Sequence, residues 1–415
     1  MSTIPQAPRA PRPDIGFVEF VLMIAALMAL GALGIDSMLP NLPAIGEALG
    51  VTDENRRQII ITAYFLGFGG VQMVYGPLAD RYGRRPVMLV GLVLYVGFSL
   101  ACALAHSFEM LLVARVFQGV GAAATRAVPV SVVRDRYAGR EMARVMSLTS
   151  MVFMGAPILA PSLGQAVLVL ASWPWIFGLL ATFGGAVLIW VLFRLPETLH
   201  PEDRLPIEPR RILASFVAAA SNRTSICYTL AQTFLFGGIL GFVNSAQQVF
   251  ADAFHNAAIF PLVFAICASF IILASVFNAR FVTRFGMRWI SHTALVAFLA
   301  IVATHLLVAV SGRETLVLFT AFQALTMLTF GLTSGNFGAM AMEPMGHIAG
   351  VASSFQGFLS MLGASLIGFV IGQNFNGTVA PVEAGYLVCG LLSLTAVLLA
   401  ERGRLFRPHR PVAMV

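Results

Sequence analysis

Three charged residues, Asp36, Arg115 and Arg126, lie inside long apolar stretches of this sequence, where they could do chemistry. A charged side chain surrounded by hydrocarbon is costly, so residues of this kind are functional candidates. The Asp36 carboxyl group could take up and release a proton, or it could serve only as the structural partner of a cation. Arg126 could contact a substrate or bond to backbone carbonyl groups. The residues alone leave both pairs of alternatives open.

The two arginines share one face of a helix. Arg115, Gly119, Ala122 and Arg126 follow the spacing i, i+4, i+7 and i+11, which aligns them on an α-helix. At a rise of about 1.5 Å per residue, Arg126 lies about 16 Å further along that helix than Arg115. Asp36 ends a stretch that runs the other way, so we expect Asp36 and Arg115 at comparable depth, where they could pair.

Two stripes of small and uncharged polar residues follow helical spacing in the second half of the chain. They consist of Gly237, Gly241, Asn244 and Gln248, and of Thr326, Thr329, Thr333 and Asn336. We expect a substrate cavity lined by Asp36, Arg115, Gly119, Arg126, Asn244, Gln248, Thr326 and Thr333. The Thr hydroxyls could instead bond back to the preceding turn of their own helix. His292 and His305 could titrate near neutral pH, but no polar stripe surrounds them, so a structural role is expected.

No catalytic motif accompanies these residues. The sequence contains no HExxH zinc motif, Walker loop, Rossmann fingerprint or paired acids at catalytic spacing. The cysteines fall singly in apolar stretches, which is typical of small buried hydrophobic residues rather than of metal ligands or disulfides; they are Cys102, Cys227, Cys267 and Cys389. We therefore expect no enzyme, no cofactor and no metal.

Long apolar stretches must position the charged and polar residues. The 415-residue chain is 58% hydrophobic and 11% charged, with a mean hydropathy of +0.85, which is typical of a protein embedded in a bilayer. About twelve stretches could each cross a hydrocarbon core of about 30 Å as a helix. They lie near 17–39, 58–79, 86–105, 110–132, 143–170, 174–195, 224–249, 257–279, 288–310, 315–342, 348–373 and 381–400. The short alternating strands of a membrane barrel are absent from the pattern, so the sequence predicts an all-α membrane protein.

The distribution of arginine predicts the orientation of the chain. All 26 basic residues are Arg, and most of them lie on one side of the membrane if the N-terminus is cytoplasmic. Cytoplasmic loops of membrane proteins are enriched in such residues. We therefore expect both termini in the cytoplasm. The pI of about 9.7 reflects this bias and does not indicate binding of nucleic acid.

The chain divides into two related halves. RYGRR (81–85) has a counterpart in RFGMR (284–288), roughly 200 residues later, as duplication of a six-helix unit would produce. We expect a cytoplasmic tail at 1–16, a six-helix bundle at 17–200, a cytoplasmic linker at 201–222, a second, pseudo-symmetric six-helix bundle at 223–402 and a cytoplasmic tail at 403–415. Residues 211–220 could lie along the cytoplasmic surface of the membrane.

Several motifs resemble those of the major facilitator superfamily. GPLADRYGRRPV (76–87) resembles its signature loop between helices 2 and 3, and RVFQGVGAA (115–123) resembles the helix 4 motif of its proton-coupled members. GAPILAPSLG, which contains Gly155, Pro157, Pro161 and Gly164, is similar to the helix 5 motif of its drug exporters. Together with IDSMLPNLP (35–43), RDRYAGREMARVMS (134–147) and LPETL (195–199), the pattern looks like the Bcr/CflA drug-resistance branch.

The resemblance implies alternating access around a central cavity lined by helices 1, 4, 7 and 10, the helices that carry the charged and polar stripes. It also implies a lock in the outward-open state, in which Asp80 interacts with the N-terminal end of helix 11 while Arg84 and Arg134 bond around it. The expected lock residues are Gly76, Asp80, Arg81, Gly83, Arg84 and Arg134. Two departures from the family pattern are WPWIF (173–177) where WRWIF is usual, and Thr283 in place of the Asp in the second copy of the loop.

Together these observations predict a proton-coupled antiporter that exports small amphipathic drugs, phenicol-like or bicyclomycin-like, across the inner membrane. Asp36 would carry the proton beside Arg115, and the pair would separate in at least one state because a close cation favours the charged carboxylate. With one acid and two Arg, the cavity is expected to favour neutral or zwitterionic compounds. The expected partners are protons, a small-molecule substrate and the lipid bilayer, and we expect a monomer.

The alternative is a proton-linked or facilitative transporter of a small metabolite such as a sugar or an amino-acid derivative, which the helix 5 motif disfavours. A receptor or a membrane enzyme would need a soluble domain or a catalytic constellation, and the sequence contains neither.

Overall fold

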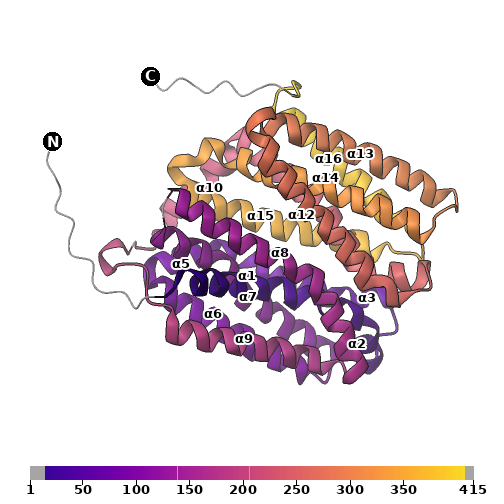
Figure 1. Ribbon diagram of the computed structural model, residues 1–415, viewed down its shortest axis with the longest axis horizontal. Coiled ribbons are helices and arrows are strands. Elements are labelled where there is room, and N and C mark those ends of the chain that lie inside the picture. Colours follow the sequence, from indigo (N-terminus) through magenta and orange to yellow (C-terminus); the bar gives the residue numbers. More distant parts are fainter. Residues whose placement is uncertain (1–14, 138, 205, 407–415) are drawn as a thin grey trace.

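Long helices run side by side through the whole molecule (Figure 1). The computed structural model describes residues 15–137, 139–204 and 206–406, and it contains no strand within them. The N-terminal helices are α1 (Phe17–Asp36), α4 (Ile59–Gly70), α5 (Gln72–Tyr82), α6 (Arg84–Ala103), α7 (Phe108–Arg136), α8 (Gly139–Leu170) and α9 (Pro174–Arg194). The C-terminal helices are α11 (Arg223–Gln248), α12 (Phe260–Phe285), α13 (Met287–Val310), α14 (Leu316–Met342), α15 (Ala349–Gln373) and α16 (Ala380–Ala400).

Short helices connect the long ones. They are η1 (Leu39–Asn41), α2 (Leu42–Ala48) and α3 (Glu54–Arg57) between α1 and α4, η2 (Pro201–Asp203) and α10 (Pro209–Ser221) in the linker, and η3 (Val249–Ala253), η4 (Ala257–Ile259) and η5 (Glu343–Ile348) in the second half. The helix α10 covers the segment expected to lie along the membrane surface, and it packs against α11 and α15.

The membrane-spanning helices agree with the apolar stretches of the sequence. In the described part of the chain, 11 helices are long and apolar enough to cross a membrane, and the bent pair of α4 and α5 makes up to 12. This confirms the predicted all-α membrane fold. The pair is bent by 42° at Val71, directly after Gly69 and Gly70, and glycine is a weak helix former.

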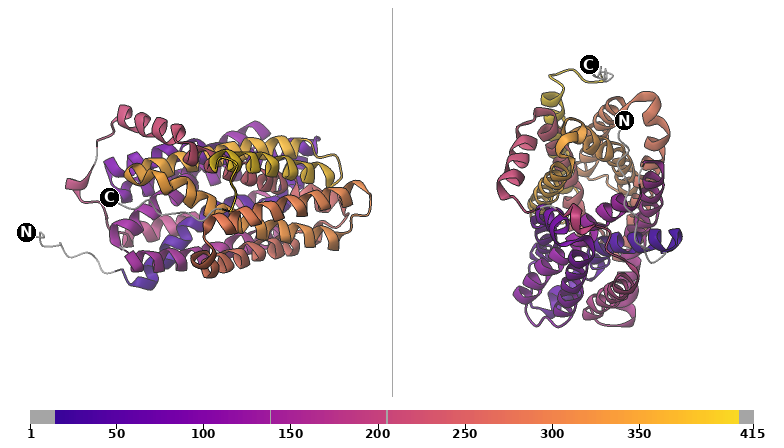
Figure 2. Two further views of the ribbon diagram at one scale, coloured as in Figure 1. Left: turned by 90° about the horizontal axis from the view of Figure 1, so that it is seen from above. Right: turned by 90° about the vertical axis from the view of Figure 1, so that its left-hand side faces the viewer.

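The two halves of the chain occupy two halves of the molecule, with α1 to α9 on one side and α11 to α16 on the other (Figures 1 and 2). They meet along two seams, where α4 and α5 pack against α15 and where α8 packs against α12. A Cβ atom on Gly69 would lie 3.0 Å from the Leu362 backbone nitrogen, and one on Gly76 would lie 3.3 Å from the Ser354 Oγ. Glycine therefore lets the halves approach closely at the first seam.

The internal repeat is visible in the backbone. Gly83 and Gly286, which correspond in the two copies of the loop, have φ angles of 104° and 81°. These left-handed conformations favour glycine and end one helix just before the next begins. A Cβ atom on Gly83 would also overlap the Glu197 carboxylate.

The second half contains its own polar cluster at the end of α16. The Glu401 Oε1 atom accepts hydrogen bonds from the Arg288 Nε atom (2.7 Å) and from the Tyr228 hydroxyl (2.7 Å). Burial opposes ionisation of Glu401, but the bonds from Tyr228 and Arg288 outweigh it and hold the pKa of Glu401 below its usual range. The cluster ties α11, α13 and the end of α16 together.

Another buried cluster surrounds His305. Its Nε2 atom lies 3.1 Å from the Glu314 Oε1 atom, and its Nδ1 atom lies 3.1 Å from the Glu383 Oε2 atom. His305 and Glu383 are both fully buried. The acidic partners come from the connection after α13 and from the first turn of α16, so periodicity along α13 alone gave no sign of them.

We expect Glu401→Gln to lower the free energy of unfolding by about 1–3 kcal/mol, because the bond from Arg288 loses its charged acceptor. Since the folded pKa of Glu401 is lowered, its contribution is present at neutral pH and is lost as the pH falls below the usual Glu range of about 4.3. Thermal unfolding of the detergent-solubilised protein at several pH values measures this. The control is Glu202→Gln in η2, an exposed side chain; an equal effect of both substitutions would contradict the assignment.

Candidate substrate cavity and its two ends

A large cavity of about 1080 Å³ lies between the two halves and is lined by described residues of both. Ligand pockets usually enclose about 300–1,000 Å³, so the space admits a drug-sized molecule with water around it. Helices α1, α4, α5, α7 and α8 contribute to one wall, and α11, α12, α14 and α15 contribute to the other. This arrangement matches the position expected for a substrate site.

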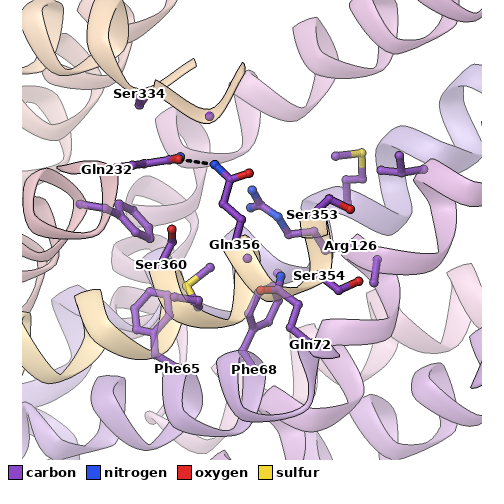
Figure 3. Close-up of a pocket in the computed structure, with 18 of the residues that line it drawn as sticks. Phe65, Phe68, Gln72, Arg126, Gln232, Ser334, Ser353, Ser354, Gln356 and Ser360 are labelled. Atoms are coloured by element: carbon purple, nitrogen blue, oxygen red, sulfur yellow. Dashed lines mark hydrogen bonds between the residues drawn. The ribbon is translucent and has the colours of Figure 1, made fainter. Parts of the chain in front are cut away.

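Aromatic and methionine side chains make up much of the wall. They include Phe65, Phe68, Phe236, Phe330, Met73 and Met361. Figure 3 shows Phe65 and Phe68 in the same part of the cavity as a group of amide and hydroxyl side chains, most of which come from the C-terminal half. Flexible thioethers and flat rings can accommodate apolar bodies of different shapes, so the wall suits amphipathic ligands.

Asp36 ends α1 and lies on the cavity wall. Its exposed fraction is 9%, and among the described residues no hydrogen bond or ion pair holds its carboxyl group. The helix 5 motif lies beside it: a Cβ atom on Gly164 would overlap the Ser37 carbonyl oxygen, and the Asn41 Nδ2 atom donates a hydrogen bond to the Gly164 carbonyl (3.2 Å). Gly164 thus allows α8 to pack directly against the chain that follows Asp36.

Arg115 does not lie on the cavity wall, and this corrects its expected placement. Its guanidinium is fully buried and donates to the Gly34 carbonyl (2.9 Å), the Gln118 Oε1 atom (2.6 Å) and the Ile60 carbonyl (3.4 Å). The Tyr64 ring centroid lies 4.4 Å from its Cζ atom. No ion pair with Asp36 forms among the described residues, because α1 offers Arg115 a backbone carbonyl instead.

Arg115 belongs to a group of donors that fix the backbone of α1. The Tyr95 hydroxyl donates to the Leu30 carbonyl (3.2 Å), and the Tyr64 hydroxyl donates to the Gly31 carbonyl (3.3 Å). A backbone carbonyl has a second lone pair, so it can accept these bonds in addition to its helical bond. The second half of α1, which ends at Asp36, is therefore held in place by α4, α6 and α7.

Arg126 lies on the cavity wall, as expected. Its side chain is exposed to the cavity, and within the described chain no hydrogen bond or ion pair engages its guanidinium. Gly119 lies on the same face of α7 as Arg126, but it is buried against α4. A Cβ atom at this position would overlap the Tyr64 carbonyl oxygen. The helix face that the sequence predicted is thus divided between a packing surface and the cavity.

The remaining residues expected in the cavity lie outside its described wall. Thr333 bonds back to the Thr329 carbonyl (3.1 Å) and the Phe330 carbonyl (2.9 Å), which is the alternative that the sequence left open. Thr326 is fully buried and Asn244 is 3% exposed, so both face neighbouring helices. The side chains that do line the cavity include Gln72, Gln232, Gln356 and Ser360 (Figure 3). No charge or helical stripe in the sequence marks them.

Gln248 belongs to a group of amides that closes the end of the cavity beyond Asp36, which we call the distal latch (Asn55, Gln58, Gln248, Gln373 and the Gly372 carbonyl). The Gln58 Nε2 atom donates to the Gln248 Oε1 atom and to the Gly372 carbonyl (3.1 Å). The Gln248 Nε2 atom donates to the Asn55 Oδ1 atom (2.8 Å), and the Gln373 Nε2 atom donates to the Asn55 carbonyl (2.6 Å). These bonds join the N-terminal half to α11 and α15.

The opposite end of the cavity, which we call the Arg-rich end, is open. Asp80, Arg134 and Glu208 line it there, and all three side chains are at least partly exposed. Arg84 is bonded to the Asp80 carboxylate (2.5 Å) and to the Asp135 carboxylate (3.0 Å). The contact of Asp80 with the start of α15 was expected in the outward-open state, and the described residues show no such bond with this end of the cavity open.

Other residues around Arg84 shape this open end. The Glu197 carboxylate accepts hydrogen bonds from the backbone N–H groups of Arg84 (2.9 Å) and Arg85 (3.2 Å). Arg81 and Arg134 have no ion pair or hydrogen bond within the described part of the chain. Of the two arginines expected around Asp80, only Arg84 bonds to it among the described residues, and the second partner of Arg84 is Asp135. Neither Asp135 nor Glu197 was singled out from the sequence. Of the helix 5 motif, Pro157 lines the cavity, whereas Pro161 is buried and Gly155 is partly buried within α8.

We expect Gly372→Ala to weaken the distal latch, because its Cβ atom would overlap the Gln58 Oε1 atom and would displace that amide from its bonds. Spin labels at the exposed positions Thr52 and Ala258, one on each half, should then give longer interspin distances than in the unsubstituted background. The four native cysteines are buried and should not compete for label. Gly97→Ala, where a Cβ atom meets nothing within 4 Å, is the control; unchanged distances for Gly372→Ala would show that the latch does not hold this end closed.

Comparison with known proteins identifies the family. A family model described as "Major Facilitator Superfamily" matches residues 22–368. The "Uncharacterized MFS-type transporter YdgK" of Bacillus subtilis is 30% identical over 369 residues, which cover 87% of this chain and 90% of that protein. The "Bicyclomycin resistance protein homolog" of Haemophilus influenzae is 28% identical (87% and 91% covered), and the "Multidrug resistance protein MdtL" of Escherichia fergusonii is 29% identical (91% and 94% covered).

Solved structures give the same fold at lower identity. A peptide transporter, POT, in complex with sulfate has a TM-score of 0.72 at 16% identity, covering 94% of this chain and 96% of that chain. A D-xylose–proton symporter has a TM-score of 0.71 at 11% identity, covering 94% and 99%. The chain therefore belongs to the Major Facilitator Superfamily, so it is a multi-pass membrane transporter and not an enzyme.

Proposed function

We propose that the protein exports small amphipathic compounds, phenicol-like or bicyclomycin-like, in exchange for protons. The observation that carries the proposal is the position of Asp36, a carboxyl group without a partner among the described residues, on the wall of a cavity of about 1080 Å³ between the halves. Relatives of similar length named for multidrug and bicyclomycin resistance support the substrate class.

The conformation of the two ends supports an exchange cycle. The cavity is open at the Arg-rich end and closed by the distal latch. The enrichment of arginine supports a cytoplasmic location of the Arg-rich end, because cytoplasmic loops of membrane proteins are rich in Arg and Lys. Substrate would enter from that side, the halves would rock about their seams, and the latch would open toward the outside.

Separation of Asp36 from Arg115 favours a proton-carrying role. A carboxylate paired with a close cation keeps its charge, whereas an unpaired carboxylate in a confined, largely apolar space is costly. Uptake of a proton from outside would remove that charge, and a substrate donor group reaching Asp36 from the cytoplasmic side would favour release of the proton. Proton and substrate would thus compete for one group, which is the requirement for antiport.

One proton per cycle supplies sufficient free energy. A proton moving down about 100 mV releases about 2.3 kcal/mol, and a gradient of one pH unit adds about 1.4 kcal/mol. Their sum maintains roughly a 500-fold gradient of a neutral substrate at about 1.4 kcal/mol per decade. A single carboxyl group such as Asp36 is therefore enough.

Asp36→Asn tests this function. In everted membrane vesicles with an imposed pH gradient, we expect the wild type to accumulate a phenicol and to release protons when the drug is added, and we expect Asp36→Asn to lose at least about 90% of the coupled transport because Asn cannot exchange the proton. Asp203→Asn in η2 is the matched control, because this side chain is exposed in the linker.

Two results would overturn the proposal. If Asp36→Asn retains gradient-driven drug transport, another group carries the proton. If the wild-type vesicles exchange protons for a sugar or an amino-acid derivative but for none of a panel of drugs, the protein is the metabolite transporter kept as the alternative.

A further inference from the structure

We propose that Arg126 is the anchor for an anionic group of the substrate, so that the preferred cargo is a dipolar amphipathic compound with a carboxylate or a similar anion at one end. This inference rests on the proposed transport function but is carried by a separate observation. The Arg126 side chain is exposed to the cavity, and no acid, carbonyl or amide of the described residues engages it. A guanidinium offers five N–H donors in a planar fork that matches a carboxylate.

The charges of the cavity leave Arg126 available. The charged side chains on the described wall are Asp36, Asp80, Arg126, Arg134 and Glu208. Asp80 is bonded to Arg84, and Asp80, Arg134 and Glu208 lie at the open Arg-rich end. Asp36 and Arg126 are therefore the charged groups deep in the cavity. Because Arg115 is turned away into the N-terminal half, the interior holds one cation and one acid rather than the two cations that the sequence suggested.

Uncharged groups near Arg126 define the rest of the site. Gln72 lies on the wall, but its Oε1 atom is buried against α15 and has no hydrogen-bond partner among the described residues. In the C-terminal half, the Gln356 Nε2 atom donates to the Gln232 Oε1 atom (2.9 Å). This bond leaves the Gln356 Oε1 atom as an acceptor and the Gln232 Nε2 atom as a donor (Figure 3). The cavity thus offers donors at Arg126 and Gln232 and acceptors at Gln356 and Asp36.

This arrangement selects a class of ligand. An acceptor or anionic end would bind Arg126, a donor end would reach Gln356 or Asp36, and the apolar body would lie against Phe65, Phe68 and Phe236. A compound with a donor group at one end and an anion at the other is compatible with exchange for a proton. Its donor end would compete with the proton for Asp36, and Arg126 would neutralise its anionic end. A dication has no partner at Arg126 and is repelled by it.

The test compares two fluorescent probes with the same apolar body, dansylglycine and dansylglycinamide, on the purified full-length transporter in nanodiscs without a pH gradient. Hydrogen bonds to charged groups are strong enough that we expect the carboxylate probe to bind about 10-fold more tightly or better. Arg126→Gln should bring the ratio of the two dissociation constants to about 1 while the amide probe still binds. Arg280→Gln, an exposed arginine of α12 outside the described cavity wall, should keep the wild-type ratio.

Arg126→Lys provides a second variant if Arg126→Gln does not fold. Lysine keeps the charge but loses the planar fork, so the preference should fall several-fold without disappearing. The proposal is overturned if the wild type does not prefer the carboxylate, if Arg126→Gln or Arg126→Lys keeps the full preference, or if a folded Arg126→Gln loses both probes equally. Binding without a gradient does not depend on proton exchange, so failure here is distinguishable from failure of Asp36→Asn in vesicles.

Discussion

A charge inside a membrane has to be paired, solvated or surrounded by hydrogen-bond partners, and the fold accommodates its intramembrane charges in different ways. Arg115 is surrounded by neutral acceptors, among them the Gly34 carbonyl of α1. Arg126 and Asp36 face a cavity that can hold water or a substrate. The backbone of α1 explains this difference. Its carbonyl groups accept hydrogen bonds from Tyr64, Tyr95 and Arg115. Because Arg115 is satisfied in this way, Asp36 at the end of α1 is left without an ion pair.

The two ends of the cavity use different chemistry. The distal latch consists of neutral amides and backbone carbonyls, whereas the Arg-rich end contains Arg84 between the carboxylates of Asp80 and Asp135. Amide hydrogen bonds each contribute little net free energy, about 0.5–1.5 kcal/mol, so a small set of them can close and open without a large barrier. The ion pairs around Arg84 lie within the N-terminal half, and they can keep their partners while the halves move.

The repeat shows which features both halves require. Gly83 and Gly286 adopt the same left-handed turn, and Glu197 and Glu401, each just beyond the last helix of its half, bind the arginine loop that follows the turn. The intramembrane charges are not repeated. The N-terminal half carries Asp36 and Arg126, while the C-terminal half presents Gln232 and Gln356 to the same cavity. Both halves therefore share the glycine turn and the glutamate that binds the arginine after it. The two halves differ in the side chains that they present to the cavity.

The sequence by itself determined the membrane-spanning helices, because burying a backbone in hydrocarbon requires long apolar helices whose length is set by the bilayer. It also identified Asp36 and Arg126, since a charge in such a helix stands out against its neighbours. Only the tertiary structure decided that Arg115 turns away from the cavity, that Gln248 joins the distal latch, and that Gln72, Gln232 and Gln356 line the wall. Helical periodicity fixes the face on which a side chain lies but not the helix that packs against that face, and a neutral amide gives no signal until its neighbours in space are known.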